Sequence, residues 1–78
     1  MTAPRVVTVD VQDMVCAQAL AAVAAAMARV QPGDLLDVRC NTDDVHRDLI
    51  AWTRHAGHAL RELDDRRLHI TRRAEEPS

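Results

Sequence analysis

The stretch from Arg5 to Leu20 reads RVVTVDVQDMVCAQAL and contains the change of pattern that decides the fold. Its first half alternates, with Val7, Val9 and Val11 on one face, which predicts a β-strand over residues 5–11. Its second half opens an alanine-rich segment, Ala17 to Val30, with high helix propensity and apolar residues at helical spacing. A strand therefore passes into a helix within a few residues.

The rest of the chain repeats this alternation of strand and helix. Pro32-Gly33 ends the first helix, and Gly57 is a natural left-handed cap for the second. Trp52, the only aromatic residue, falls on the apolar stripe of the second helix and is expected in the core. The later elements are predicted to be a strand over Leu35–Cys40, a helix from the Asn41–Asp44 loop to about Ala56, and a hairpin of His58–Leu63 and Arg67–Thr71.

These elements predict an α/β (α+β) two-layer sandwich in the order β-α-β-α-β-β. Crossovers between parallel strands are right-handed, so both helices are expected on one face of a four-stranded mixed sheet. The first helix should begin within two residues of Cys16. A chain of 78 residues is too short for a second core. We therefore expect one domain over residues 5–72, between flexible segments at 1–4 and 73–78.

Charge and hydropathy argue against several classes of partner. The formal net charge is −2, and acidic residues flank the arginine pairs at 66–67 and 72–73, so the chain lacks a broad basic face for nucleic acid. The longest apolar run, residues 19–28, is too short to cross a bilayer, and the N-terminal residues do not follow a signal-peptide pattern. We expect no direct nucleic-acid binding, no membrane association and a cytoplasmic location.

The two cysteines, Cys16 and Cys40, are predicted to be thiols. They do not form a CxxC motif, and a cytoplasmic chain rarely keeps a structural disulfide. The four histidines are not accompanied by cysteine pairs at zinc-finger spacing, so we expect no metal site and no cofactor.

Cys16 is the residue to which the sequence assigns chemistry. It lies between the first strand and the first helix, at the carboxyl edge of the sheet. The unpaired amides and positive end of a helix favour the thiolate, which is the form that attacks a persulfide or disulfide sulfur. The same surroundings would stabilise an anionic persulfide. The alternative is an inert, half-buried cysteine that packs beneath a loop.

A series of motifs spans the chain from about Val6 to Thr71. They are Asp10, Cys16, Leu20, Pro32-Gly33, the acidic loop Asn41-Thr42-Asp43-Asp44, Asp48-Leu49, Trp52 and Gly57-His58. In this order and at these spacings they resemble the TusA/SirA-type sulfurtransferases. That family has an Asp six residues before a Cys-Pro-x-Pro motif, then Pro-Gly, Asp-Ile-Pro, an aromatic residue and Gly-His.

The resemblance implies a TusA-like domain over residues 5–72 that relays sulfur as a persulfide on Cys16. A donor protein of the cysteine desulfurase or rhodanese type would supply the sulfur, and an acceptor protein would receive it. The resemblance implies no cofactor. An unpaired edge of the sheet would permit a weak homodimer, so a monomer or a weak homodimer is expected.

The chain departs from the family pattern around the cysteine. Ala17 and Ala19 replace the two prolines of Cys-Pro-x-Pro, Ile50 replaces that of Asp-Ile-Pro, and Asp13 replaces the glycine three residues before Cys16. Alanine can continue a helix but does not fix φ as proline does. The Asp13 carboxylate is expected to oppose the thiolate, so that Asp13→Gly would favour it. The alternative function is therefore a non-catalytic partner-binding or regulatory module.

Several other residues are candidates for supporting Cys16. Cys40 shares a strand face with two apolar residues, which predicts core packing, with a resolving thiol beside Cys16 as the alternative. His46 is a candidate donor to a bound persulfide, although a solvated helix residue is the simpler interpretation. Arg39 and Arg47 are candidates for guiding an acidic loop of a partner. The complete set of candidate supporting residues is Asp13, Ala17, Gln18, Arg39, Cys40, His46 and Arg47.

Overall fold

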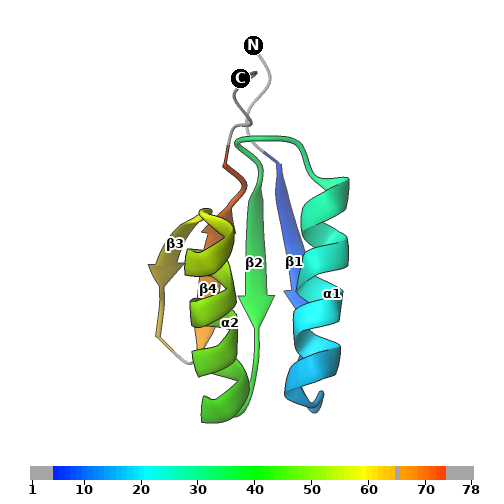
Figure 1. The fold of residues 1–78 in the computed structure, drawn as a ribbon, viewed down its shortest axis with the longest axis vertical. Helices are drawn as coiled ribbons and strands as arrows, with labels where there is room; N and C mark the ends of the chain where they lie inside the picture. Colours follow the sequence, from blue (N-terminus) through cyan, green and yellow to red (C-terminus); the bar gives the residue numbers. More distant parts are fainter. Residues whose placement is uncertain (1–4, 65, 74–78) are drawn as a thin grey trace.

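The computed structural model describes residues 5–64 and 66–73 (Figure 1). The elements are β1 (Val6–Asp10), α1 (Cys16–Arg29), β2 (Leu35–Arg39), α2 (Asp43–Ala56), β3 (Ala59–Glu62) and β4 (Arg67–Thr71). The β-α-β-α-β-β order is confirmed, and the predicted bounds shift only slightly. Helix α1 begins at Cys16 itself, as its position before the alanine-rich segment predicts.

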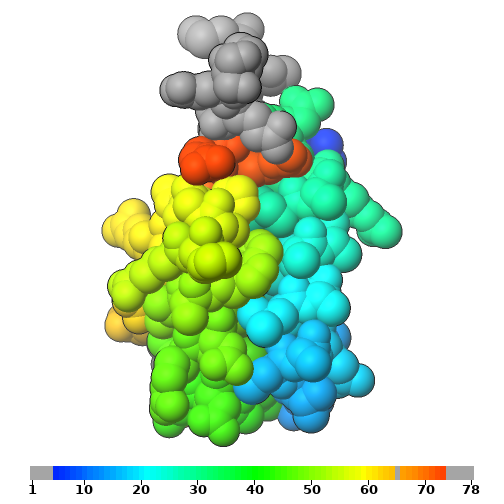
Figure 2. All heavy atoms as spheres, viewed as in Figure 1, coloured from blue at the N-terminus to red at the C-terminus, as the bar shows by residue number. Residues whose placement is uncertain are grey.

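The four strands form one mixed sheet in the order β1-β2-β4-β3. Strands β1 and β2 are parallel, whereas β4 is antiparallel to both of its neighbours, β2 and β3. Helix α2 therefore connects β2 to a strand that is not its neighbour, and β4 fills the gap between them. Both helices lie on one face of the sheet, and Figure 2 shows them packed side by side over it. The predicted two-layer sandwich is confirmed.

The core lies between this face of the sheet and the two helices. The alternation of each strand directs every second residue inwards, and Leu36 and Val38 of β2 are completely buried, as are Leu68 and Ile70 of β4. The buried apolar residues are Val11, Ala19, Val23, Met27, Val30, Leu36, Val38, Cys40, Val45, Leu49, Leu68 and Ile70. These core side chains are aliphatic or contain sulfur, which agrees with the near absence of aromatic residues.

The buried face of α2 is rotated relative to the sequence prediction. Val45 and Leu49 are buried as expected, but the next buried position is Thr53 and not Trp52. The Thr53 hydroxyl donates a 2.7 Å hydrogen bond to the Leu49 carbonyl, so its burial leaves no unsatisfied hydroxyl. Trp52 is only half-buried at the edge of the core, where its ring lies 6.1 Å from that of His58. The indole therefore covers the core without entering it.

At the end of the molecule away from Cys16, polar contacts hold the chain before β1, the turn after α1 and the chain after β4. The Asp34 carboxylate accepts the backbone N–H groups of Gln31 and Arg5, and these bonds lower its pKa. The Arg72 guanidinium donates to carbonyls at the end of α1, and the Arg73 N–H donates to His58 Nδ1 over 3.0 Å. The flexible N-terminal segment predicted at 1–4, and residues 74–78 of the flexible tail predicted at 73–78, lie outside the described residues.

Candidate functional site

Two loops meet at the carboxyl end of the parallel strands β1 and β2. In Figure 1 the starts of α1 and α2 lie together at this end, because both helices follow parallel strands. Asp13 and Asn41 join the loops: the Asp13 N–H donates to Asn41 Oδ1 over 3.0 Å, and Asn41 Nδ2 donates to Asp13 Oδ1 over 2.8 Å. The paired side chains fix the β1–α1 loop, and with it the start of α1.

Asp13 occupies a backbone conformation that explains the glycine expected at this position. Its φ is 64°, in the left-handed region that glycine adopts without strain and that Asp tolerates better than most residues. A turn of this shape lets the chain leave β1 and begin α1 within a few residues. The carboxylate that replaces the glycine hydrogen is bound to Asn41, so the substitution provides a contact between loops.

Cys16 is the first residue of α1, and its side chain is half-buried. Val15 precedes the helix in an extended conformation, and its N–H donates to Gln18 Oε1 over 3.4 Å. The first amides of a helix have no partner within it, so the thiol lies beside free donors. Ala17 stands at the second helical position. A proline there, as in the family motif, would cost no intrahelical hydrogen bond, because the N–H groups of the first turn have no partner within the helix. This placement agrees with the sequence prediction.

The electrostatic surroundings of Cys16 differ from those expected at a helix start alone. The pKa of the thiol is raised, first by a hydrogen bond with the Asp48 side chain, then by desolvation and the negative charges of Asp48 and Asp44. These carboxylates outweigh the lowering effect of the backbone. Asp13, which we expected to oppose the thiolate, is not among the groups responsible. The expected thiolate is therefore disfavoured, and the source of the opposing charge is α2.

Asp44 and Asp48 are the site residues that sequence reasoning missed. They lie one turn apart on α2, so they share a helix face, and that helix starts at the same edge of the sheet as α1. Asp48 was matched to the Asp-Ile-Pro motif of the family but was not placed beside the cysteine. The sequence did contain a signal for this placement. The two predicted parallel strands end at the same edge of the sheet, and the helix that starts there carries two carboxylates at i, i+4 spacing.

The family of this chain follows from a comparison with protein-family models. The family model described as Sulfurtransferase TusA matches residues 7–72. The chain belongs to the TusA family. Neither a curated protein nor a solved structure matches the chain. The TusA match covers every helix and strand almost from end to end, and it includes both the Cys16 loop and the α2 carboxylates.

Cys40 of this TusA domain is buried, as its strand phase predicts. Only 3% of the residue is exposed, and its Sγ donates to the Arg66 carbonyl over 3.2 Å. Desolvation raises the pKa of the Cys40 thiol, and the nearby Arg66 offsets this only in part. Both cysteines are free thiols. The structure therefore gives Cys40 the surroundings of a packing residue, held by the β3–β4 turn.

We expect iodoacetamide to modify Cys16 and to leave Cys40 unmodified in the folded protein. Both thiols have a raised pKa, so access to the reagent distinguishes them: Cys40 is buried, whereas Cys16 is half-exposed. Peptide mapping after labelling at neutral pH distinguishes the two sites. Labelling in denaturant provides the control in which both cysteines react. Equal rates in the native protein would contradict the burial of Cys40 and support a working pair of thiols.

The remaining candidate supporting residues have partners away from Cys16. Arg39 Nε lies 3.6 Å from Asp37 Oδ2, on the face of the sheet that the helices do not cover. His46 Nε2 lies 3.9 Å from Glu62 Oε1, so the imidazole points towards β3. Arg47 is exposed on α2, and its charge helps to lower the pKa of Asp43.

His58 of the Gly-His motif has a structural environment in this TusA domain. Burial and the charges of Arg73 and Arg72 lower the pKa of its imidazole, which accepts the Arg73 N–H. Gly57 ends α2 with a φ of 83°, and a Cβ at this position would lie 2.8 Å from an Arg73 guanidinium nitrogen. Gly-His therefore lets the chain turn out of α2 beneath Arg73.

Two further classes of site are not found in the part of the chain that the structure describes. Residues 5–64 and 66–73 contain no cluster of three or more His, Cys, Asp or Glu side chains arranged to hold a metal ion. Within the same ranges, neither helix has the length and hydropathy required to span a membrane.

Proposed function

We propose that this protein relays sulfur as a persulfide on Cys16 between a donor protein and an acceptor protein. The observation that carries the proposal is the position of a half-exposed cysteine at the first residue of α1 in a domain of the TusA family. The free amides of the first helical turn are suited to stabilising an anionic persulfide. Proteins of the cysteine desulfurase or rhodanese type are the proposed donors, and the cytoplasm is the proposed location.

The proposed transfer is an exchange at sulfur without net oxidation. The Cys16 thiolate attacks the terminal sulfur of a persulfide on the donor, a new S–S bond forms at Cys16, and the donor S–S bond breaks. The donor cysteine leaves as a thiolate, and Cys16 carries the sulfur as a persulfide. In the second step an acceptor thiolate attacks that terminal sulfur and releases the Cys16 thiolate. Each step needs a second protein, because the chain has one accessible thiol among its described residues.

We propose that Asp48 and Asp44 keep Cys16 protonated until a partner docks. Both carboxylates raise the pKa of the thiol. A partner that places a basic side chain beside them would neutralise this charge and release the thiolate. The surroundings of Cys16 therefore favour a partner with a basic surface. This differs from the acidic partner loop expected from Arg39 and Arg47, because Arg39 pairs with Asp37 on the other face of the sheet.

The direct test is to incubate the reduced protein with a persulfide donor and to measure its intact mass. The proposal predicts a gain of one sulfur atom, reversed by a reducing agent and located on Cys16 by peptide mapping. A TusA-family protein with an intact Cys-Pro-x-Pro motif provides the positive control. If that control gains sulfur and this protein does not, the relay proposal fails and a partner-binding module without sulfur chemistry takes its place.

Asp48→Asn is expected to increase the reaction rate of Cys16 with iodoacetamide near neutral pH. The substitution removes the negative charge that raises the thiol pKa but keeps an oxygen that can accept a hydrogen bond. The pH–rate profile should shift to lower pH, because the thiolate forms earlier in the titration. Asp64→Asn, which removes a charge from the exposed β3–β4 turn, is the matched control. Identical profiles for Asp48→Asn and wild type would rule out Asp48 as the controlling group.

A further inference from the structure

The face of the sheet opposite the helices carries its own set of residues, most of them polar. The strand register aligns them in rows across the sheet: Leu35, Thr71 and Ala59 form one row, Asp37, His69 and Arg61 the next, and Arg39 and Arg67 a third. These residues come from β2, β4 and β3. We refer to this set as the open face. It is separate from the Cys16 site, which lies at the carboxyl end of β1.

A buried carboxylate organises the centre of the open face. Asp37 is only 5% exposed, and Arg67 Nη2 donates to both of its oxygens, over 3.0 and 3.2 Å. His69 Nε2 lies 3.2 Å from Asp37 Oδ1, and Arg39 Nε lies 3.6 Å from Oδ2. Burial alone would raise the pKa of Asp37, but Arg67, His69 and Arg39 outweigh it and the pKa is lowered. Asp37 of β2 therefore holds the ring of His69 in place on the neighbouring strand β4.

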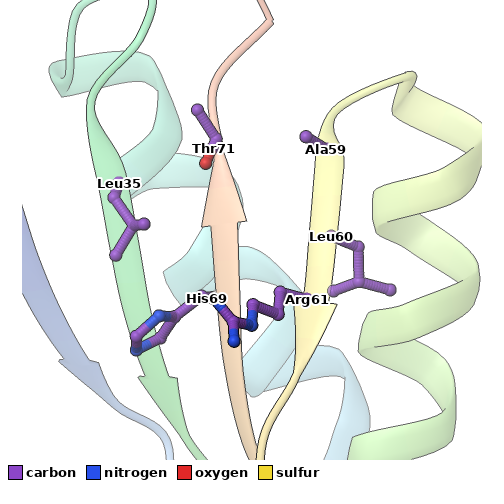
Figure 3. A pocket seen from close by; sticks show the side chains of 6 residues that line it. All are labelled: Leu35, Ala59, Leu60, Arg61, His69 and Thr71. Atoms are coloured by element: carbon purple, nitrogen blue, oxygen red, sulfur yellow. The ribbon is translucent and has the colours of Figure 1, made fainter.

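A pocket of about 240 Å³ lies beside this cluster. Its floor and wall are formed by Leu35, Ala59 and Thr71, which are apolar or carry a methyl group, while Arg61 and His69 form its polar side. Figure 3 shows the Arg61 side chain reaching from β3 across β4 towards the His69 ring. Small residues at 59 and 71 leave room for a ligand between the longer side chains.

Arg61 is the charged group of the pocket that has not been neutralised. Within residues 5–64 and 66–73, no ion pair or hydrogen bond engages its guanidinium, whereas Arg67 and Arg39 share Asp37. The rows on β2, β4 and β3 contain three arginines and one aspartate, and β1 adds Asp10 beside Arg39. This part of the face therefore has an excess of positive charge, although the whole chain carries a net charge of −2.

We propose that the pocket on the open face binds a small organic monocarboxylate, with its carboxylate against Arg61 and its hydrocarbon part over Leu35, Ala59 and Thr71. A guanidinium presents parallel donors that match a carboxylate. The apolar floor favours a ligand with a short hydrocarbon body, which a bare inorganic anion lacks. This site does not depend on the sulfur chemistry of Cys16.

Titration of the 15N-labelled protein with butyrate, followed by amide chemical shifts, tests the proposal. Saturable shifts are expected at Leu35, Ala59, His69 and Thr71. The neutral isostere butyramide should bind at least about tenfold more weakly, which corresponds to loss of a charge-assisted hydrogen bond. Inorganic phosphate at matched ionic strength should also bind more weakly. Phosphate binding tighter than butyrate binding, or no saturable shift at the pocket, would overturn the proposal.

Three variants separate the pocket from general attraction between an anion and surface arginines. Arg61→Gln removes the charge at similar size and should weaken butyrate binding about tenfold. Arg54→Gln removes an exposed arginine on α2 and should leave binding unchanged. Ala59→Leu fills the floor of the pocket with a larger side chain, keeps Arg61 and His69, and should abolish butyrate binding. Equal weakening by Arg61→Gln and Arg54→Gln, or normal binding by Ala59→Leu, would refute the assignment. The amide spectra report whether each variant is folded.

Discussion

Cys16→Ala is expected to abolish sulfur loading completely, with no gain in intact mass after exposure to a persulfide donor that loads the wild-type protein. The proposed relay forms its S–S bond at this sulfur, and the other cysteine is buried against the β3–β4 turn. The free energy of unfolding should change by about 1 kcal/mol or less, because the side chain is only half-buried at the start of α1. Loss of loading would then report chemistry and not unfolding.

Cys40→Ala provides the matched control for the loss of a thiol. It should retain one loaded sulfur per chain, with a modest loss of stability from the packing and the hydrogen bond to Arg66. Sulfur carried by Cys16→Ala, or its absence from Cys40→Ala while the protein remains folded, would contradict Cys16 as the carrier residue. Denaturant unfolding of both variants supplies the comparison of stability.

Leu49→Ala should have the largest effect on stability, lowering the free energy of unfolding by about 3 kcal/mol. Leu49 is completely buried between α2 and the sheet, and truncation to alanine leaves a cavity that close-packed neighbours fill only in part. A domain of this length has a total stability of roughly 4–12 kcal/mol, so the loss is a substantial fraction. Trp52, the sole aromatic residue, lies on the same helix and provides the fluorescence signal for urea unfolding.

Ile50→Ala is the control for this prediction, because Ile50 neighbours Leu49 but is only half-buried. Its cost should be clearly smaller, at about 1 kcal/mol. Leu49→Ala should also increase the rate at which Cys40 reacts with iodoacetamide, since a smaller unfolding free energy exposes the core more often. Equal losses for Leu49→Ala and Ile50→Ala would contradict the assigned orientation of α2.

The elements of the fold and the position of Cys16 could be predicted from the sequence because they depend on local pattern. Alternation in β2 predicts the burial of Leu36, Val38 and Cys40, and all three are buried. The alanine-rich segment predicts a helix that starts beside Cys16, and Gly57 predicts the left-handed cap that ends α2. The family motifs extended these local predictions to the whole domain, which the match over residues 7–72 confirms.

The rotation of α2 about its own axis could not be predicted in detail from spacing. Residues one position apart on a helix point about 100° apart, so Trp52 and Thr53 compete for the same buried stripe. Hydropathy favours Trp52, but the space beside Leu49 accepts the smaller Thr53, whose hydroxyl bonds within the helix. The packing of α2 against α1 and the sheet decides this choice, and it leaves Trp52 at the edge of the core.

By itself the sequence determined the order of the elements, the faces of the strands and the place of Cys16 at a helix start. Only the tertiary structure decided what surrounds that thiol: Asp48 and Asp44 come from α2, and they reverse the pKa shift that the helix start predicts. The tertiary structure likewise decided the surroundings of Asp37, which is buried beneath arginines of two strands. Local pattern records the preferences of neighbouring residues, whereas a pKa depends on charges that are close in space and distant in the chain.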